Sequence, residues 1–174
     1  MANDVFVDGQ ATANGMSKSV KRNLQADKTQ VPTAFEMLEQ AIRDHKKFLF
    51  YTMPRHISNL LIGKYEPGMS YGTHTDSAIM NNGYRSDISF TLSLSDPNSY
   101  EGGELTMETS FGDQRIKLPA GSLVLYPTGG LHRVEEVTSG ERVVVVGWLQ
   151  SRIRDVEKRQ ILIDMHIARK AYLE

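Results

Sequence analysis

The chain has 174 residues, no cysteine and a formal net charge of −1. The length fits one domain with a buried core, and we expect residues 1–174 to form a single domain. The near-neutral charge argues against nucleic acid or an anionic membrane as a partner, and the lack of cysteine excludes disulfides, thiolate metal sites and a cysteine nucleophile. The amino terminus lacks the regions of a signal peptide and no apolar run reaches membrane-spanning length, so we expect a cytoplasmic protein.

The amino-terminal part combines a polar segment with one amphipathic helix. Residues 1–30 show no clear period, and we expect loops with one short strand at Val5–Val7. Pro32 suits the first turn of a helix over residues 32–45. The apolar residues of that helix recur at helical spacing: Val31, Phe35, Leu38 and Ile42. The apolar stretch Phe48–Thr52 is interpreted as a short strand.

A series of short strands follows. Residues 57–66 form a candidate strand that ends at a Pro-Gly turn, and residues 87–95 alternate between apolar and small polar side chains. The remaining candidate strands are separated by turns rich in Gly and Pro, including Ser139-Gly140, and span residues 104–108, 114–118, 122–126, 132–137 and 141–150. This spacing predicts an antiparallel sandwich or barrel.

The carboxyl end returns to a helical pattern. Four residues share one face of a helix over about 154–172: Val156, Gln160, Ile163 and Ile167. The many Arg and Lys residues on the other faces are most simply the solvated side of that helix. We therefore expect a mainly β core over about residues 57–151, flanked by helices at about 32–45 and 154–172.

Three residues form a candidate metal site. His74 and Asp76 stand in an H-x-D pair, whose members point to the same side of a strand, and His132 follows much later. Two histidines and one carboxylate on one face of an iron ion are typical of non-heme Fe(II) oxygenases. An H-x-D pair alone also arises by chance, and His132 alone could be a surface residue. The prediction depends on both lying at strand edges, where such folds place their ligands.

Arg142 follows the last candidate ligand by ten residues. It could form a surface ion pair with Glu141, which would contribute little. However, it opens the apolar run Val143–Trp148, which is typical of a buried strand, and a buried arginine requires a carboxylate partner. We therefore expect an organic acid as co-substrate. The other three histidines lack such spacing and are interpreted as structural or surface residues: His45, His56 and His166.

Ordered motifs along most of the chain carry a family resemblance. They include Tyr71-Gly72-Thr73-His74-Thr75-Asp76, Tyr100-Glu101-Gly102-Gly103-Glu104-Leu105, Leu118-Pro119-Ala120-Gly121, Leu131-His132-Arg133-Val134 and Gly140-Glu141-Arg142-Val143. With these motifs the segment Ile57–Ile163 resembles the Fe(II)/2-oxoglutarate dioxygenases and, within them, the prolyl-4-hydroxylase-like group called PKHD-type hydroxylases. That family usually has an additional segment before Phe6 and often continues past Glu174, so this chain resembles a compact or shortened version.

The resemblance implies a fold, a metal and a co-substrate. The fold is a double-stranded β-helix, a jelly-roll or cupin-like core with flanking helices. The catalytic iron ligands would be His74, Asp76 and His132, with Arg142 and Tyr65 binding 2-oxoglutarate. Trp148 would line the site, although it could equally be a core aromatic residue. The implied cofactors are Fe(II), 2-oxoglutarate and dioxygen, with ascorbate as a candidate reductant.

The implied reaction hydroxylates a C–H bond and releases succinate and CO2. A prolyl residue in a peptide or protein is the leading substrate. Free amino acids, other peptide side chains and small metabolites stay open, as does the oligomeric state. The polar stretch Ser77–Ser86 is either a lid, with Tyr84 and Arg85 as substrate contacts, or an ordinary surface loop.

Two alternatives remain on sequence grounds. A cupin-like metalloenzyme that does not use 2-oxoglutarate would share the fold, but such sites usually contain more histidines and need no Arg142. A non-catalytic jelly-roll binding or sensor protein is also possible in principle, but a degenerate relative commonly loses at least one ligand.

Overall fold

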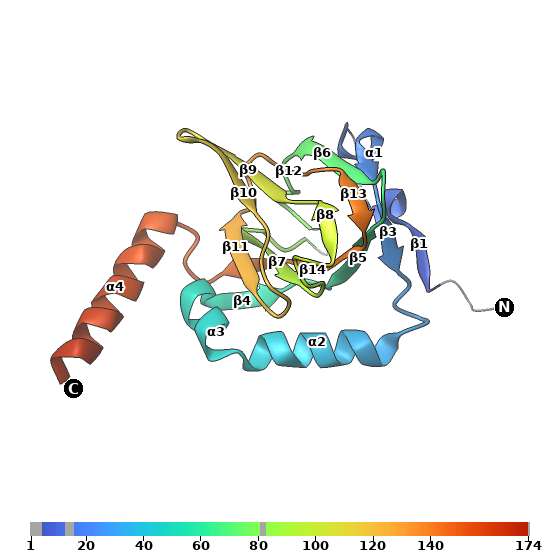
Figure 1. Ribbon diagram of the computed structural model, residues 1–174. Coiled ribbons are helices and arrows are strands. Elements are labelled where there is room, and N and C mark those ends of the chain that lie inside the picture. The colour runs from blue at the N-terminus through green and yellow to red at the C-terminus, as the bar shows by residue number, and fades with distance from the viewer. Residues whose placement is uncertain (1–4, 13–15, 81–82, 174) are drawn as a thin grey trace.

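Two antiparallel sheets face each other in the computed structural model, which describes residues 5–12, 16–80 and 83–173 (Figure 1). The large sheet has the order β1-β3-β5-β14-β7-β11, with β4 paired to β14. Its strands are β1 (Phe6–Asp8), β3 (Leu24–Ala26), β4 (Pro54–Ile57), β5 (Leu61–Tyr65), β7 (Ile88–Ser93), β11 (Leu123–Pro127) and β14 (Arg142–Ser151).

The second sheet has the order β10-β9-β12-β6-β2. Its strands are β2 (Lys21–Arg22), β6 (Ser70–His74), β9 (Leu105–Thr109), β10 (Gly112–Ile116) and β12 (His132–Val134). A separate pair joins β8 (Tyr100–Gly102) to β13 (Val137–Gly140). This arrangement confirms the expected mainly β, jelly-roll core.

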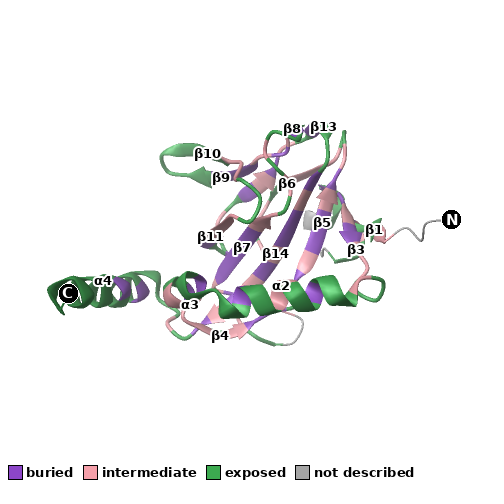
Figure 2. Ribbon diagram, turned by 60° about the horizontal axis from the view of Figure 1, so that its bottom comes forward, coloured by how far each residue is buried: buried purple, intermediate pink, exposed green. Residues whose placement is uncertain are grey.

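The main apolar core lies between the large sheet and two helices, α2 (Pro32–Asp44) and α3 (Lys46–Thr52) (Figure 2). The alternation in β7 explains this placement, because Ile88 and Phe90 point toward the helices and Ser89 and Thr91 point toward the other sheet. The rings of Phe90 and Phe48 pack edge to face, with their centroids 5.3 Å apart. The outer face of the large sheet is therefore filled, which leaves its inner face for a site.

The expected strand at Phe48–Thr52 is wrong, because these residues belong to α3. His45 begins the helix with its Nδ1 accepting from the Phe48 backbone N–H at 3.0 Å, and Met53 ends it with a left-handed φ of 44°. A short apolar run does not distinguish a strand from a buried helix turn, and here the packing of Phe48 on the core decided it.

The first 30 residues hold more structure than the single expected strand. In addition to β1, β2 and β3, they form a 3-10 helix at Gly9–Thr12 and a short helix, α1, at Met16–Ser19. Elsewhere the expected strand at 57–66 is divided between β4 and β5. Ser139 and Gly140 belong to β13, so the expected turn there is also wrong.

The carboxyl-terminal helix, α4 (Val156–Leu173), extends away from the sheets (Figure 1). The helix itself is confirmed, but the expected apolar face is not buried along its length. Among its described residues only Arg159 and Ile163 are buried, and Val156 and Ile167 are about half exposed. No helix in the described ranges is both long and apolar enough to cross a membrane.

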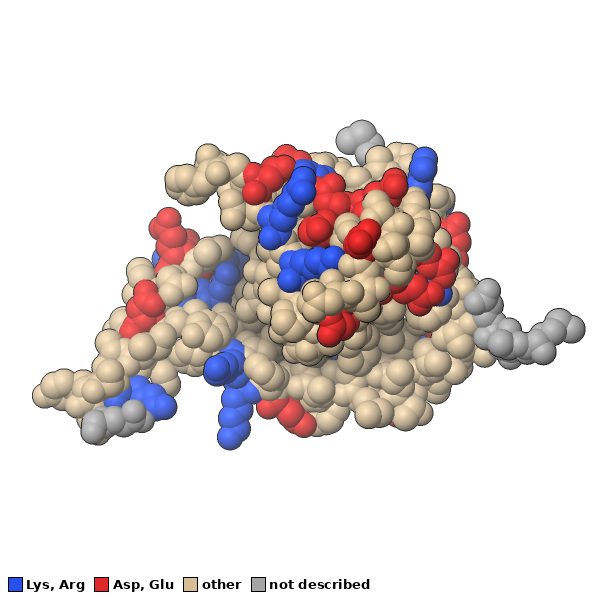
Figure 3. Space-filling model, viewed as in Figure 1, with Lys and Arg blue, Asp and Glu red and all other residues tan. Residues whose placement is uncertain are grey.

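The face of the molecule shown in Figure 3 carries acidic and basic side chains side by side. On the second sheet, Arg133 of β12 contacts three carboxylates, those of Glu108, Asp113 and Glu135, at 2.6–3.3 Å. These pairs tie β9, β10 and β12 together on the outer side of that sheet.

Candidate metal centre and its cavity

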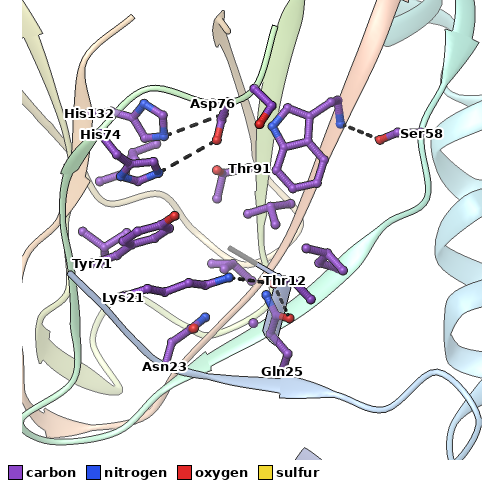
Figure 4. A pocket seen from close by; sticks show the side chains of 18 of the residues that line it. Thr12, Lys21, Asn23, Gln25, Ser58, Tyr71, His74, Asp76, Thr91 and His132 are labelled. Carbon is purple, nitrogen blue, oxygen red and sulfur yellow. Dashed lines mark hydrogen bonds and ion pairs between the residues drawn. The ribbon is translucent and has the colours of Figure 1, made fainter. Parts of the chain in front are cut away.

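The structure brings His74, Asp76 and His132 together. β6 and β12 pair with His74 directly opposite His132, and Asp76 lies two residues beyond the end of β6. The Nε2 atoms of His74 and His132 lie 3.9 Å and 3.8 Å from the two carboxylate oxygens of Asp76 (Figure 4). All three ligand atoms lie within 4.8 Å of one another, which is close enough for one metal ion to contact all of them.

Backbone carbonyls orient both imidazoles. Nδ1 of His74 is 2.8 Å from the Gly72 carbonyl oxygen, and Nδ1 of His132 is 2.9 Å from that of Gly130. A carbonyl only accepts, so in each ring Nδ1 carries the proton and Nε2 presents a lone pair toward Asp76. Burial, together with the neighbouring His132, lowers the pKa of His74 to about 4, which keeps its ring in the neutral, ligating form at pH 7.

Neighbouring side chains hold the ligands in place. The Ser89 hydroxyl of β7 donates to Asp76 Oδ2 at 2.7 Å, which leaves Oδ1 for a metal. The Tyr71 ring stacks on His74, with centroids 3.7 Å apart. Mutation of such residues around the ligands typically weakens metal affinity by about 10–100-fold.

A cavity of about 450 Å³ lies beside the three residues and between the two sheets. Arg142 lines the same cavity and is only 4% exposed. Its Nη1 has no hydrogen-bond partner, and no carboxylate of the described residues lies within 4.0 Å of the guanidinium. A buried cation with an unsatisfied N–H fits an anionic ligand in the cavity.

Tyr65 and Gly103 define the position of Arg142. Tyr65 lies opposite Arg142 in the β5–β14 register, with its ring 5.1 Å from the guanidinium carbon. Burial raises the pKa of Tyr65 to about 12, so its hydroxyl stays a proton donor. Gly103 has a φ of +66°, and a Cβ there would lie 3.0 Å from Cδ of Arg142, so glycine allows the close approach.

The other predicted site residues divide into two groups. Trp148 lines the cavity, and its backbone N–H donates to the Ser58 hydroxyl at 3.1 Å. Tyr84 and Arg85 do not line it. Tyr84 stacks on His56 at 3.7 Å between centroids, and Arg85 binds Asp87 through two N–H groups at 2.6 Å and 2.9 Å.

The stretch 77–86 still reaches the cavity through other residues. Ile79 pairs with Arg85 in an isolated β-bridge, so the described part of this stretch forms a small hairpin, and Ile79 and Met80 line the cavity. The lid prediction for residues 81–82 lies outside the described residues. The three remaining histidines do not line the cavity: His45, His56 and His166.

The sequence reasoning missed a group of polar residues from the amino-terminal segment, the polar wall: Thr12, Lys21, Asn23 and Gln25. All four line the cavity. Lys21, Asn23 and Gln25 occupy alternate positions of the extended segment that contains β2 and β3, so they point to the same side of it. That period was visible in the sequence, but it consists of polar residues and does not mark a core face.

Comparison with known proteins identifies the family of this chain. The sequence profile of the 2OG-Fe(II) oxygenase superfamily matches residues 60–150, a range that contains all three candidate ligands and Arg142. This chain belongs to the 2OG-Fe(II) oxygenase superfamily. Membership implies Fe(II), 2-oxoglutarate and dioxygen, and it favours an oxygenase over both a cupin-like enzyme without 2-oxoglutarate and a non-catalytic jelly roll.

Curated relatives place the chain among the PKHD-type hydroxylases. It is 48% identical over 169 residues to one from Picosynechococcus sp., covering 95% of this chain and 76% of the relative. It is 49% identical over 170 residues to one from Crocosphaera subtropica, covering 95% of this chain and 77% of the relative. The chain therefore spans about three quarters of the length of these relatives.

Solved structures support the fold. A prolyl-4-hydroxylase from Pseudomonas putida superposes with a TM-score of 0.56 at 21% identity, covering 85% of this chain and 78% of the other. The viral collagen prolyl hydroxylase of Paramecium Bursaria Chlorella virus-1, solved with 2OG, gives 0.57 at 18% identity, with 78% and 83% covered. These 2OG oxygenases share the double-stranded β-helix with this member of the superfamily.

Proposed function

We propose that this protein hydroxylates a C–H bond of its substrate, with His74, Asp76 and His132 as the iron ligands and Arg142 and Tyr65 as the residues that bind 2-oxoglutarate. The main support for this proposal is Arg142. It is buried, it lines the same cavity as the three candidate ligands, and its Nη1 has no hydrogen-bond partner. A dicarboxylate that reaches from the metal to Arg142 would satisfy both ends of this arrangement.

The protein's own residues would position the reactants. When bound, iron with 2-oxoglutarate and dioxygen supplies the oxidation, and succinate and CO2 leave as products. His74 and His132 present Nε2 lone pairs because their Nδ1–H groups are held by carbonyls. The Arg142 fork would orient the far carboxylate of 2-oxoglutarate, and the protonated Tyr65 hydroxyl would donate a further hydrogen bond.

The cavity lining would keep water away from the reaction. Trp148, Val144 and Val146 lie on the inner side of β14, and Ile79 and Met80 come from the 77–86 hairpin at the cavity. The described residues of this stretch, 77–80 and 83–86, form the proposed lid. Arg85 would anchor this lid to the large sheet. Its guanidinium binds the Asp87 carboxylate, and it donates to the Ser151 carbonyl oxygen at 3.2 Å.

A prolyl residue in a peptide or protein is the proposed substrate, with ascorbate as the proposed reductant. One structural relative supports the peptide, a prolyl hydroxylase from Trichoplax adhaerens solved with a peptide fragment of hypoxia inducible factor, with a TM-score of 0.56 and 17% identity. Identity at this level supports the fold, so peptide binding is carried over here as a proposal. Free amino acids, other peptide side chains and small metabolites are the alternative substrates.

Anaerobic titration of 2-oxoglutarate into the Fe(II)-loaded protein tests the proposed site. A weak visible metal-to-ligand charge-transfer band should appear in the wild type, disappear in Asp76→Ala and require much higher 2-oxoglutarate in Arg142→Met. Arg55→Met is a matched control, because Arg55 is an exposed residue of β4 outside the cavity. Iron binding without the band would refute chelation of 2-oxoglutarate, and failure to bind iron would refute the ligand set.

With the band established, succinate release in the presence of proline-containing peptides tests the substrate. Peptides that raise succinate release above the peptide-free rate, with hydroxyproline as product, would support the prolyl assignment. Stimulation by small molecules and by none of the peptides would contradict it.

A further inference from the structure

Lys21 places an ammonium group in the same cavity as the metal centre. The residue is only 5% exposed, and its Nζ donates to the Thr12 hydroxyl at 2.8 Å. Thr12 accepts one of the three N–H groups of the ammonium, and no carboxylate of the described residues lies within 4.0 Å of Nζ. Asp76 and Asp8 act on the ammonium only from beyond contact distance. A buried ammonium with no carboxylate in contact is costly to the folded protein unless a ligand supplies the anion.

The net charge of the cavity lining also favours an anionic ligand. The charged lining residues among those described are Lys21, Arg142 and Asp76, so two cations face one carboxylate and the lining has an excess of positive charge. A divalent iron and the dianionic 2-oxoglutarate cancel each other. The excess therefore persists in the loaded enzyme, and a substrate with one negative charge would neutralise it.

The position of Lys21 suits a substrate rather than the iron. Tyr71 lies between His74 and Lys21 in Figure 4, stacked on the imidazole at 3.7 Å and with its ring centre 5.4 Å from Nζ. The ammonium is thus one aromatic ring away from the metal centre. An anion held there would fix one end of a molecule whose reacting carbon lies near the iron.

The polar wall holds Lys21 in place. The Thr12 hydroxyl lies 2.9 Å from Oε1 of Gln25 and 3.1 Å from the Gly9 carbonyl oxygen, so it donates to one of these acceptors while accepting from Lys21. The Nε2 amide of Gln10 donates to the Lys21 carbonyl oxygen at 3.2 Å. The ammonium is therefore built into the cavity by the 3-10 helix and two strands, unlike a surface lysine that reaches in by chance.

We propose that Lys21 determines specificity by pairing with a carboxylate of the substrate, so that the enzyme acts on a carboxyl-terminal residue or a free amino acid in preference to a residue inside a peptide. This inference rests on the proposed function and narrows its substrate class. The shared chemistry is a free carboxylate near the reacting carbon, which a peptide terminus and a free amino acid both provide.

Matched carboxylate and carboxamide compounds test the inference on the full chain loaded with Fe(II) and 2-oxoglutarate without oxygen. The probes are Gly-Xaa dipeptides, the same dipeptides as carboxamides, and free amino acids with their amides. Binding is read from the change that each probe causes in the charge-transfer band. Turnover is read from succinate release after oxygen is admitted.

Carboxylates should bind the wild type at least about tenfold more tightly than their amides, as expected for a charge-assisted hydrogen bond. This ratio should fall to about one in Lys21→Met, because methionine cannot donate a charged hydrogen bond. It should return in part in Lys21→Arg, because arginine keeps a charged donor. Lys28→Met is the control, because Lys28 pairs with Glu39 outside the cavity and should preserve the ratio. Dipeptides and free amino acids distinguish the two sources of the carboxylate.

Several outcomes would overturn the inference while leaving the proposed function intact. These are equal binding of acids and amides, a preference that survives in Lys21→Met, or no binding by any acid although the band forms. If Lys21→Met weakens 2-oxoglutarate instead of the probes, Lys21 belongs to the co-substrate site and the inference is wrong. Absence of the band in the wild type would refute the proposed function itself, which separates the two failures.

Discussion

Replacing Arg142 by methionine should weaken 2-oxoglutarate binding far more than it affects folding. The proposed fork makes two charge-assisted hydrogen bonds, each contributing about 1.5–3 kcal/mol. Their loss corresponds to a decrease in 2-oxoglutarate affinity of about two to four powers of ten. In the protein without ligand, the same guanidinium is buried with Nη1 unsatisfied, so removing it eliminates a desolvated charge.

The free energy of unfolding of the ligand-free variant should therefore stay within about 2 kcal/mol of the wild type. Loss of the Arg142 contact to the Tyr65 ring and of its hydrogen bond to Tyr100 works against the gain from removing the charge. These opposing contributions are the reason for expecting a small net change of either sign.

Calorimetric titration and thermal unfolding of the metal-loaded protein without oxygen measure the two effects. At a concentration of 2-oxoglutarate 100 times its Kd, binding stabilises the folded state by about 2.7 kcal/mol. For a chain of this size that corresponds to a rise in Tm of about 5–10 °C. The wild type and Arg55→Met should show this rise, and Arg142→Met should not at the same concentration.

Two results would refute this reasoning. If Arg142→Met binds 2-oxoglutarate within about threefold of the wild type, no charged fork is lost, because even one such bond is worth about tenfold. If the ligand-free variant loses more than about 4 kcal/mol, Arg142 is a structural residue whose charge is already satisfied in the folded protein.

Three further predictions follow from other contacts. Ser89→Ala removes the hydrogen bond to Asp76 Oδ2 and should weaken metal binding by about 10–100-fold in anaerobic titrations, and unchanged affinity would contradict it. Burial lowers the pKa of Lys21 from 10.5 to about 8. The buried ammonium therefore destabilises the folded protein below about pH 8, and this destabilisation disappears as the pH rises toward 10.5. Lys21→Met should thus stabilise the metal-free protein by about 1–3 kcal/mol at pH 7 in urea unfolding, and this gain should vanish by about pH 10.5, whereas a pH-independent difference would contradict the assignment. Phe90 is fully buried against Phe48, so Phe90→Ala should cost about 3–5 kcal/mol in the same assay, and a cost below about 1 kcal/mol would show that the core is packed elsewhere.

Local patterns in the sequence were enough to predict several elements. The helix at residues 32–45 was confirmed as α2 because its apolar spacing matches one face packed on the core, with Phe35 and Ile42 buried. The alternation over residues 87–95 was confirmed as β7 for the same reason, with apolar residues facing the helices. In both cases one period in the sequence matches one buried face.

The candidate ligands were also predictable as a set. An H-x-D pair requires only strand geometry to bring two side chains to one side, and the ten-residue spacing from His132 to Arg142 matched a known family. What the sequence left open was whether His132 would meet His74. The antiparallel register of β6 and β12 decided that, since it sets the two residues opposite each other.

The roles of residues whose neighbours are distant in the chain depend on tertiary contacts. Lys21 was part of a segment interpreted as loop, and it became a cavity residue because β2 pairs with β6 and β3 with β5. Phe48–Thr52 forms a helix in which Phe48 packs against Phe90. Arg85 does not line the cavity because its guanidinium pairs with Asp87. Local periodicity reports which side chains share a face, but burial, charge pairing and cavity shape arise from contacts between segments that the sequence does not place side by side.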